Sequence, residues 1–498
     1  MAARPRIGFV SLGCPKNLVD SEVMMGLLDR AGAEITNSPE LADILVVNTC
    51  SFIDRAKQES VDTILEMAEL KASGNAQKLI VAGCLVERYR DEIRKNIPDV
   101  DAVVGTGELE KILSAAGLDT AASPSDAELP LFNILSSSPP APSPASSAVV
   151  PLSRPEGDLR EAQGRFAREI WQGAHAALPQ SLYDHTTPRL LSTGKASAYI
   201  KIAEGCDHPC SFCIIPNLRG KFRSRRFESV VAEAEQLVAN GVREITLIGQ
   251  DTTCYGEDLG LRDGLAQLLD RLARIENLKW LRFLYAYPNR ITGRLLDTMA
   301  GHSNICKYLD VPLQHASGSV LKAMKRGGNA DIFLKTIEKI RASMPNIVLR
   351  TSFITGFPGE TAADFTVLTD FVREAKFDWL GVFGYSDEEG SGAHHLGEKV
   401  PAKTIESRQR SLMRLQKSIS KASKARLVGQ TFDLLAQGES DETPLLWEGR
   451  TEHQAPEIDG KVYINDFGPF DQLIPGRFYR CEITESHEYD LVAGIIGE

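Results

Sequence analysis

Three cysteines lie close together in the segment "GCDHPCSFC", at Cys206, Cys210 and Cys213. Their thiolates could hold three irons of a 4Fe-4S cube and leave the fourth iron without a protein ligand. A structural zinc site would need a fourth ligand, for which His208 inside the segment is the candidate. Cysteines that are simply buried in a core are the remaining alternative. The spacing favours an iron–sulfur cluster with one open coordination position.

A second set of three cysteines is spread over the first hundred residues, at Cys14, Cys50 and Cys84. Each closely follows a short β-rich run, at 6–12, 43–49 and 78–83. Because the carboxyl ends of parallel strands share one edge of an open sheet, these cysteines would converge there. Taken alone, they could be small buried residues at strand ends. Beside the other set, they predict a second three-cysteine iron–sulfur site.

The chain of 498 residues has 43% hydrophobic and 25% charged residues, as ordinary globular proteins do. No apolar run approaches the roughly 18 residues that cross a bilayer, and no signal-peptide core follows the start. We therefore expect a cytoplasmic protein with no membrane partner. In a reducing cytosol, clustered cysteines are metal ligands or catalytic thiols rather than disulfides. The remaining cysteines lack partners at ligand spacing and are interpreted as structural: Cys254, Cys306 and Cys481.

The elements that must position these cysteines are predicted by alternating β-rich and helical patterns. Before residue 119, further strand-like runs occur at 33–37 and 101–105, and a helical pattern occurs at 21–32. Such alternation predicts an α/β domain over 4–118 with a doubly wound parallel sheet. Residues 136–155 consist largely of Ser, Pro and Ala, which predicts a linker over 119–192 with a possible short helix at 158–176.

After the linker, the alternation resumes over 193–424. Six strands are expected there, at 197–203, 243–248, 280–285, 308–312, 348–354 and 379–385. Six βα units predict a partial (β/α)6 barrel rather than the closed eight-unit form. Cys206 comes just after the first of these strands, at the end where barrel enzymes place their chemistry. Over 425–496 the helical pattern stops, and short strand-like runs predict a small antiparallel β-barrel.

The segment "GCDHPCSFCIIP" resembles the signature of radical S-adenosylmethionine (SAM) enzymes, which use a partial (β/α)6 barrel. The resemblance implies that the open iron binds the amino and carboxylate groups of SAM, and that one electron yields a 5′-deoxyadenosyl radical. The whole chain, apart from its long linker, is similar to the methylthiotransferases, which end in a TRAM β-barrel. This likeness implies two 4Fe-4S clusters, a flavodoxin- or ferredoxin-like electron donor and a sulfur donor that the sequence does not identify.

The resemblance also suggests contacts to SAM at the ends of barrel strands: Gln250, Gln314, Gly356 and Gly359. The two glycines would allow close approach of the backbone to a ligand. Ordinary turn chemistry at strand ends is the alternative, and His315 is interpreted as structural. The basic segment 219–226, "RGKFRSRR", would face an anionic cofactor, a nucleic acid or acidic side chains, unless it is a solvated face.

Two methylthiotransferase branches fit this architecture, one acting on an aspartate of a ribosomal protein and one on an adenosine of transfer RNA. Residues 425–498 contain fifteen acidic and five basic residues. A domain that grips phosphates should be basic, whereas an acidic domain attracts a basic ribosomal protein or the small ribosomal subunit. Three motifs resemble the ribosomal-protein branch, the RimO type: "SLGCPKNLVDSE", "VPLQHAS" and "YSDEEGSGA".

In the last motif, Glu388 and Glu389 stand where the transfer-RNA branch, the MiaB type, tends to carry Arg-Pro. These glutamates are expected to place negative charge at the barrel mouth; a solvated loop is the alternative, but the position at the carboxyl end of a strand argues against it. The sequence therefore predicts an enzyme that adds a methylthio group to the β-carbon of an aspartate in small-subunit ribosomal protein twelve. MiaB-type modification of transfer RNA is the alternative. A non-catalytic iron–sulfur carrier is a more remote one, because a carrier would not need the barrel or its Gly-rich segments.

Overall fold

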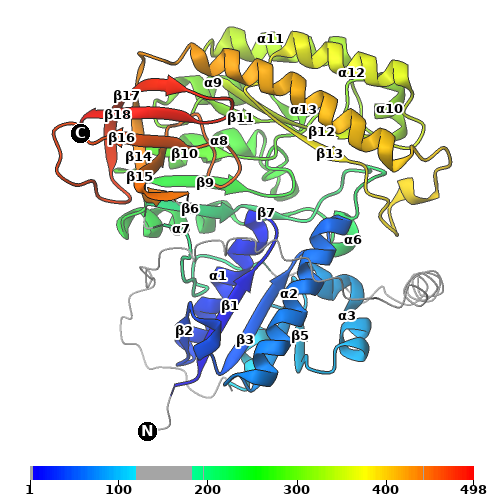
Figure 1. Ribbon diagram of the computed structural model, residues 1–498, viewed down its shortest axis with the longest axis vertical. Coiled ribbons are helices and arrows are strands. Elements are labelled where there is room, and N and C mark those ends of the chain that lie inside the picture. Colours follow the sequence, from blue (N-terminus) through cyan, green and yellow to red (C-terminus); the bar gives the residue numbers. More distant parts are fainter. Residues whose placement is uncertain (1–3, 119–181, 195, 441) are drawn as a thin grey trace.

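The computed structural model describes residues 4–118, 182–194, 196–440 and 442–498. It has three parts, an N-terminal sheet domain, a central barrel and a small C-terminal barrel (Figure 1). Within the described residues, no helix is long and apolar enough to cross a membrane.

The N-terminal domain is a five-stranded parallel sheet in the order β2-β1-β3-β4-β5. The strands are β1 Arg6–Ser11, β2 Glu34–Thr36, β3 Ile44–Thr49, β4 Lys78–Gly83 and β5 Ala102–Val104. The helices are α1 Pro15–Arg30, α2 Asp54–Ser73, α3 Cys84–Asn96 and α4 Lys111–Ala116. Alternate residues of β3 enter two cores: Leu45 and Val47 pack under α2 and α3, whereas Val46 packs under α1 and α4. The sheet is therefore covered on both faces, which confirms the doubly wound fold.

The central barrel contains six parallel strands in two three-stranded sheets. They are β6 Ser197–Lys201, β9 Glu244–Ile248, β10 Trp280–Phe283, β11 Tyr308–Asp310, β12 Val348–Thr355 and β13 Trp379–Gly384. A β-bridge between Leu281 and Ile305 joins the two sheets. The partial six-unit barrel is thus confirmed. A short ribbon, β7 Ala203–Glu204 with β8 Arg223–Ser224, flanks the cysteine segment.

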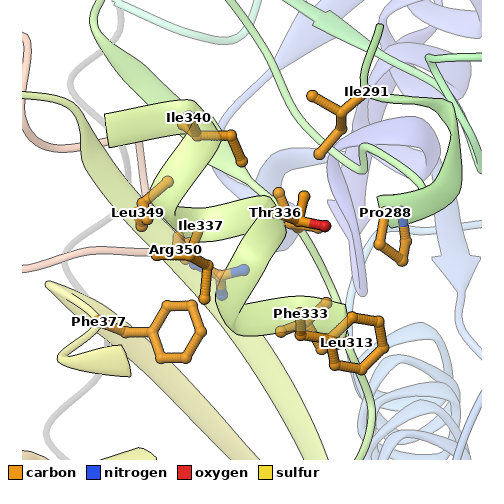
Figure 2. Close-up of a pocket in the computed structure, with 11 residues that line it drawn as sticks. Pro288, Ile291, Leu313, Phe333, Thr336, Ile337, Ile340, Leu349, Arg350 and Phe377 are labelled. Carbon is orange, nitrogen blue, oxygen red and sulfur yellow. The ribbon is translucent and has the colours of Figure 1, made fainter. Parts of the chain in front are cut away.

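Helices surround this barrel and bury its apolar outer face. They are α7 Phe227–Ala239, α8 Gly264–Leu272, α9 Gly293–Gly301, α10 Gly318–Ala323, α11 Ala330–Ser343, α12 Ala362–Ala375 and α13 Ala402–Ala425. The short helix α6 Ile215–Arg219 packs instead against α3 of the N-terminal domain, with Leu218 beside Cys84. A cavity of about 20 Å³ lies between α11 and the strands (Figure 2). Its lining is almost wholly apolar, and it is large enough only for about one water molecule. This cavity is therefore a packing defect rather than a ligand site.

The C-terminal domain is a closed five-stranded barrel in the order β14-β15-β16-β18-β17. Its strands are β14 Thr431–Ser440, β15 Thr443–Arg450, β16 Val462–Asp466, β17 Phe478–Ser486 and β18 Leu491–Gly497. The expectation of an antiparallel barrel needs one correction, because β16 and β18 pair in parallel. Five strands cannot alternate in direction around a closed ring, so one neighbouring pair must run the same way.

The predicted helix at 158–176 and most of the predicted linker lie outside the described residues. Where the chain is described again, its end is packed between the first two domains. Arg189 is buried and pairs with Glu22 of α1 and Glu233 of α7, at 2.6 Å each. A side chain at Gly26 of α1 would overlap the backbone of Pro188 and Arg189. Residues 188–189 therefore join the N-terminal domain to the central barrel.

Candidate functional site

The structure brings Cys14, Cys50 and Cys84, here called the N-terminal trio, to one edge of the first sheet. The three strands that precede them, β1, β3 and β4, are neighbours. Gly13 has a φ of +94°, and a Cβ there would lie 2.8 Å from the Cβ of Cys50. Burial raises the pKa of Cys84 to about 12, and the charges of Cys14 and Cys50 act in the same direction. The convergence expected from the strand ends is therefore present.

Cys206, Cys210 and Cys213, here called the barrel trio, follow β7 and precede α6. All three are partly buried. Burial raises the pKa of Cys206 to about 11 and that of Cys213 to about 12, and the neighbouring thiols of the trio contribute. Thiols of this kind bind metal by giving up their protons to it. The trio offers three sulfur ligands from one loop.

A cluster and a single metal ion need different distances between the cysteine sulfurs. Around one zinc ion, with Zn–S bonds of about 2.3 Å in a tetrahedral site, sulfurs lie about 3.8 Å apart. Among the described residues, only His208, Asp251 and Cys254 have three ligand atoms within 4.8 Å of one another. Neither cysteine trio is that compact. Among the described residues, neither trio therefore has the compact arrangement of a single-ion site, and the clusters stay a prediction.

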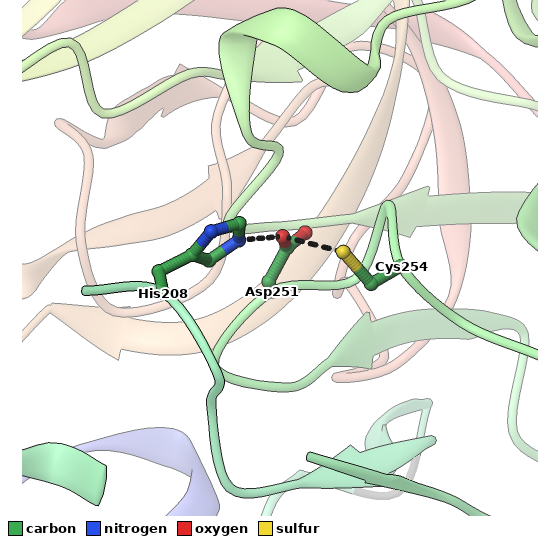
Figure 3. Close-up of side chains that lie close together, drawn as sticks. All are labelled: His208, Asp251 and Cys254. Carbon is green, nitrogen blue, oxygen red and sulfur yellow. Dashed lines mark hydrogen bonds and ion pairs between the residues drawn. The ribbon is translucent and has the colours of Figure 1, made fainter. Parts of the chain in front are cut away.

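His208, the candidate for a fourth zinc ligand, has other partners. Its Nε2 lies 2.6 Å from Asp251 Oδ2, and Cys254 Sγ donates to the same oxygen at 3.0 Å (Figure 3). Its ring is stacked on Tyr287, with centroids 3.9 Å apart. Burial and Asp251 raise the pKa of Cys254 well above its usual range. Cys254, expected to be merely structural, thus helps to hold the loop of the barrel trio through Asp251 and His208.

The two trios lie on facing parts of one interdomain seam. Arg219 follows the barrel trio on α6, and its Nη2 donates to Cys84 Sγ at 3.4 Å. Its Nη1 is bonded to Asp20 of α1 at 3.2 Å and to Glu204 at 3.1 Å. A second arginine, Arg326, donates to Cys210 Sγ, also at 3.4 Å. Each trio therefore has one cysteine sulfur that accepts a hydrogen bond from a guanidinium group.

These contacts identify partners of the basic segment 219–226. Arg219 and Arg225 are buried, and Arg225 pairs with Glu233. Of the alternatives left open by the sequence, acidic side chains of the chain itself are the observed partners of these two arginines. A solvated face describes only Lys221 and Arg226, which are exposed.

The four positions suggested for SAM contacts lie at strand ends of the barrel. Gln250 donates to Glu204 at 2.7 Å and so joins the network of Arg219. Gln314 has a φ of +72°, unusual for a residue other than glycine. At Gly356 the space that a Cβ would need is taken by Ile405 of α13, 2.3 Å away. Gly359 has a φ of +81° and more open surroundings. Their role toward SAM stays a prediction.

Two residues of the seam were missed by the reasoning from sequence. Lys16, in the first turn of α1, is 7% exposed, and its Nζ lies 3.4 Å from the ring centroid of Tyr285. Burial disfavours the ammonium, but Tyr285 and Cys14 outweigh it and raise the pKa of Lys16. Tyr285 follows β10 with a φ of +65°, a costly conformation for a bulky residue. The position of Lys16 two residues after Cys14, in "GCPKN", was the feature of the sequence that could have pointed to it.

The interpretation of Glu388 as negative charge at the barrel mouth is wrong. Its side chain is 2% exposed and lies 2.6 Å from Arg88 and 3.0 Å from Lys57, both in the N-terminal domain. The backbone carbonyl of Glu389 accepts from Arg88 as well, at 3.0 Å. Glu388 is therefore neutralised within the chain. It holds the two domains together rather than facing a substrate.

Comparisons with known proteins agree with this architecture. Residues 6–105 match the model described as "Uncharacterized protein family UPF0004", residues 200–372 match the radical SAM superfamily, and residues 428–496 match the TRAM domain. The superfamily match assigns a 4Fe-4S cluster and SAM to the central barrel. The fold is similar to the solved structure of TsrM, a radical SAM methyltransferase from Kitasatospora setae. The TM-score is 0.51 at 14% identity, over 86% of this chain and 91% of that one.

Full-length relatives give the closer relationship. A protein of Koribacter versatilis is 66% identical over 99% of this chain and 96% of its own length. A protein of Solibacter usitatus is 54% identical over 99% of this chain and 95% of its own length. Both are named ribosomal protein uS12 methylthiotransferase RimO. At such identity over the whole length, the chain belongs to the RimO family of radical SAM methylthiotransferases.

Proposed function

We propose that this enzyme replaces a hydrogen on the β-carbon of an aspartate in ribosomal protein uS12 by a methylthio group. The observation that carries the proposal is the meeting of two cysteine trios at one seam, where Arg219 beside the barrel trio reaches Cys84 of the N-terminal trio. A reaction that needs both a radical and a sulfur requires two such centres close together. The name of the relatives supports the identity of the substrate.

In this proposal the barrel trio holds a 4Fe-4S cluster with SAM at its open iron, and the N-terminal trio holds a second cluster. When bound, these groups supply the one-electron chemistry that can break an unactivated C–H bond. Arg326 and Arg219 donate to cysteine sulfurs, and such hydrogen bonds tune the reduction potential of a cluster. Cys84 is buried, so the chain itself keeps water from that side of the seam. Gln250, Gln314, Gly356 and Gly359 are the proposed contacts to SAM.

The partners in this proposal follow from charge and chemistry. The acidic C-terminal barrel suits a basic ribosomal protein, free or in the small subunit. A flavodoxin- or ferredoxin-like protein supplies electrons, and a separate donor, not identified by the sequence, supplies sulfur. A ribosomal substrate places the reaction in the cytoplasm.

Anaerobic reconstitution tests the two centres. The wild type should hold about eight irons per chain and should modify uS12 but not transfer RNA, as followed by mass spectrometry. The variant C206A/C210A/C213A should hold about four irons and should not cleave SAM. The variant C14A/C50A/C84A should still cleave SAM but should transfer no methylthio group.

The substitution Cys306→Ala is the matched control, because Cys306 is a buried cysteine outside both trios. It should leave the iron content unchanged. A wild type that holds zinc or a single cluster, or that modifies transfer RNA and ignores uS12, would overturn the proposal.

A further inference from the structure

Lys16 is a buried cation at the seam between the two trios, where its neighbours are the thiol of Cys14 and the ring of Tyr285. It is 7% exposed, and among the described residues no carboxylate forms an ion pair with its ammonium group, since the nearby Asp20 pairs with Lys201 instead. Its partner is the ring of Tyr285, 3.4 Å from Nζ. Lys201, at the same seam, differs because it bonds Asp20 and Glu204. Lys16 therefore stands out among the buried charges of this region.

A buried charge is costly unless it is paired and hydrogen-bonded. The contact with an aromatic ring offsets part of that cost, but it leaves an ammonium group with donors for a stronger partner. A carboxylate is the partner that gives the strongest charge-assisted hydrogen bonds to such a group. The environment of Lys16 is thus suited to a carboxylate, which the described residues do not provide there.

The position of Lys16 relates it to both trios. It lies two residues after Cys14 and contacts Tyr285, at the carboxyl end of a barrel strand. Two residues further on, Tyr287 stacks on His208 inside the segment of the barrel trio. One short segment, 285–287, therefore contacts the surroundings of both trios. A substrate carbon that meets both centres has to lie near this segment.

We propose that Lys16 binds the side-chain carboxylate of the substrate aspartate and so selects an acidic side chain over a neutral base. The inference rests on the proposed function. An aspartate is ionised at neutral pH, and its carboxylate is bonded directly to the β-carbon that reacts. An ion pair to Lys16 therefore fixes the reacting carbon, whereas the adenine base of transfer RNA carries no charge to pair with it.

The carboxylate of SAM is the other anion expected in the site. Arg326 donates to Cys210 of the barrel trio and has no carboxylate partner among the described residues. It is available for an anion at that centre. Lys16 belongs to the other domain and lies beside the other trio. This division favours the substrate as the partner of Lys16.

A double-mutant cycle on binding tests the proposal without relying on turnover. The holoenzyme and its Lys16→Met variant are titrated with uS12 that carries either the target aspartate or asparagine there, and binding is measured by fluorescence anisotropy. The wild type should prefer the aspartate form by about 30-fold, the lower end of what loss of one partner of a buried charge pair costs. Lys16→Met should bind both forms with similar affinity, and Lys16→Arg should keep most of the preference.

Lys71→Met is the matched control, because Lys71 pairs with Asp101 on the same domain; it should keep the full preference. Lys16→Gln serves as a second neutral variant if Lys16→Met loses iron or stability. An equal loss of affinity for both substrate forms would show a structural role and overturn the inference. So would weakened SAM binding with the aspartate preference intact. If the wild type does not bind or modify uS12 at all, the proposed function fails, and the inference fails with it.

Discussion

Arg219 Nη2 lies 3.4 Å from Cys84 Sγ, although the two residues belong to different domains and are 135 positions apart. The same guanidinium group is held by Asp20 and Glu204, both buried. One carboxylate from each domain fixes the arginine, and so a residue of the barrel sets the electrostatic surroundings of a cysteine on the other domain. The site is therefore complete only when the two domains are packed together.

Arg219→Met should destabilise the iron-free protein by about 3 kcal/mol or more, because it leaves two buried carboxylates with only Lys201 as counter-ion. Chemical unfolding measures this. Arg90→Met is the control, since Arg90 pairs with Glu108 at a partly exposed position, and it should cost about 1 kcal/mol or less. Equal costs for the two variants would contradict a special role for Arg219.

Glu388→Gln should destabilise the protein by about 3 kcal/mol, because it leaves Arg88 without its buried carboxylate, whereas Lys57 keeps Asp54. Glu389→Gln changes the neighbouring residue, whose side chain forms no ion pair within the described residues, and should cost less than about 0.5 kcal/mol. Unfolding curves of both variants decide the matter. A small effect at Glu388 would mean that the domains are joined mainly by other contacts.

Gly356→Ala should destabilise the protein by about 2 kcal/mol or more, because the new Cβ would lie 2.3 Å from Ile405 and the φ is +78°. Gly359→Ala shares the positive φ, but its nearest contact is Glu398 at 3.5 Å, so only the backbone cost of about 1 kcal/mol remains. Thermal unfolding with and without SAM separates stability from ligand binding. If both variants weaken SAM binding and leave the free energy of unfolding almost unchanged, the glycines serve ligand binding rather than the packing of α13.

His315 should make the protein sensitive to mild acid. Burial lowers its pKa to about 4, with Asp364 opposing and Arg408 adding to the effect; an unfolded histidine titrates near 6.5. Because the unfolded chain binds the proton first, this stability is present above about pH 6.5 and is lost as pH falls towards 4. His315→Asn keeps an acceptor for the backbone N–H of Ser317. It should reduce the loss of unfolding free energy between pH 7 and pH 4.5 by about 2 kcal/mol, measured on iron-free protein.

Reversal of four exposed acids of the C-terminal barrel to lysine, at Glu439, Asp471, Glu482 and Glu485, should slow association with uS12 by about 10-fold at low salt. The difference should fade at high salt, because the Debye length is then only a few ångströms. Stopped-flow binding at two ionic strengths measures it. The control reverses four exposed acids of α2: Glu59, Asp62, Glu66 and Glu69. An equal effect there would show that only net charge matters, not the C-terminal barrel.

The strands that precede the cysteines could be predicted because their own residues strongly favour a buried strand. The run at 43–49 is apolar and β-branched, and the observed strand is Ile44–Thr49, buried throughout. Cys50 then had to lie at a sheet edge. The strand Thr443–Arg450 could not be predicted in this way, because Pro444, Glu448 and Gly449 interrupt its pattern. Its neighbours in the barrel supply the pairing that its own sequence does not indicate.

The contacts across the seam could not be predicted in the same way. Glu388 and Arg88 are 300 positions apart, and a sequence gives the sign of a charge but not its partner. The same limit hid the contact between Lys16 and Tyr285. Such pairs depend on how whole domains pack, for which no local periodicity exists.

The packing of residues 188–189 against Gly26 has a consequence for engineering. Helix α4, which precedes residue 119, packs on α1, and Arg189 returns to the same helix. Described residues on both sides of 119–181 are thus fastened to one helix. A reporter domain or affinity tag could replace part of this segment, and the spacing of the cysteines would not change with its length.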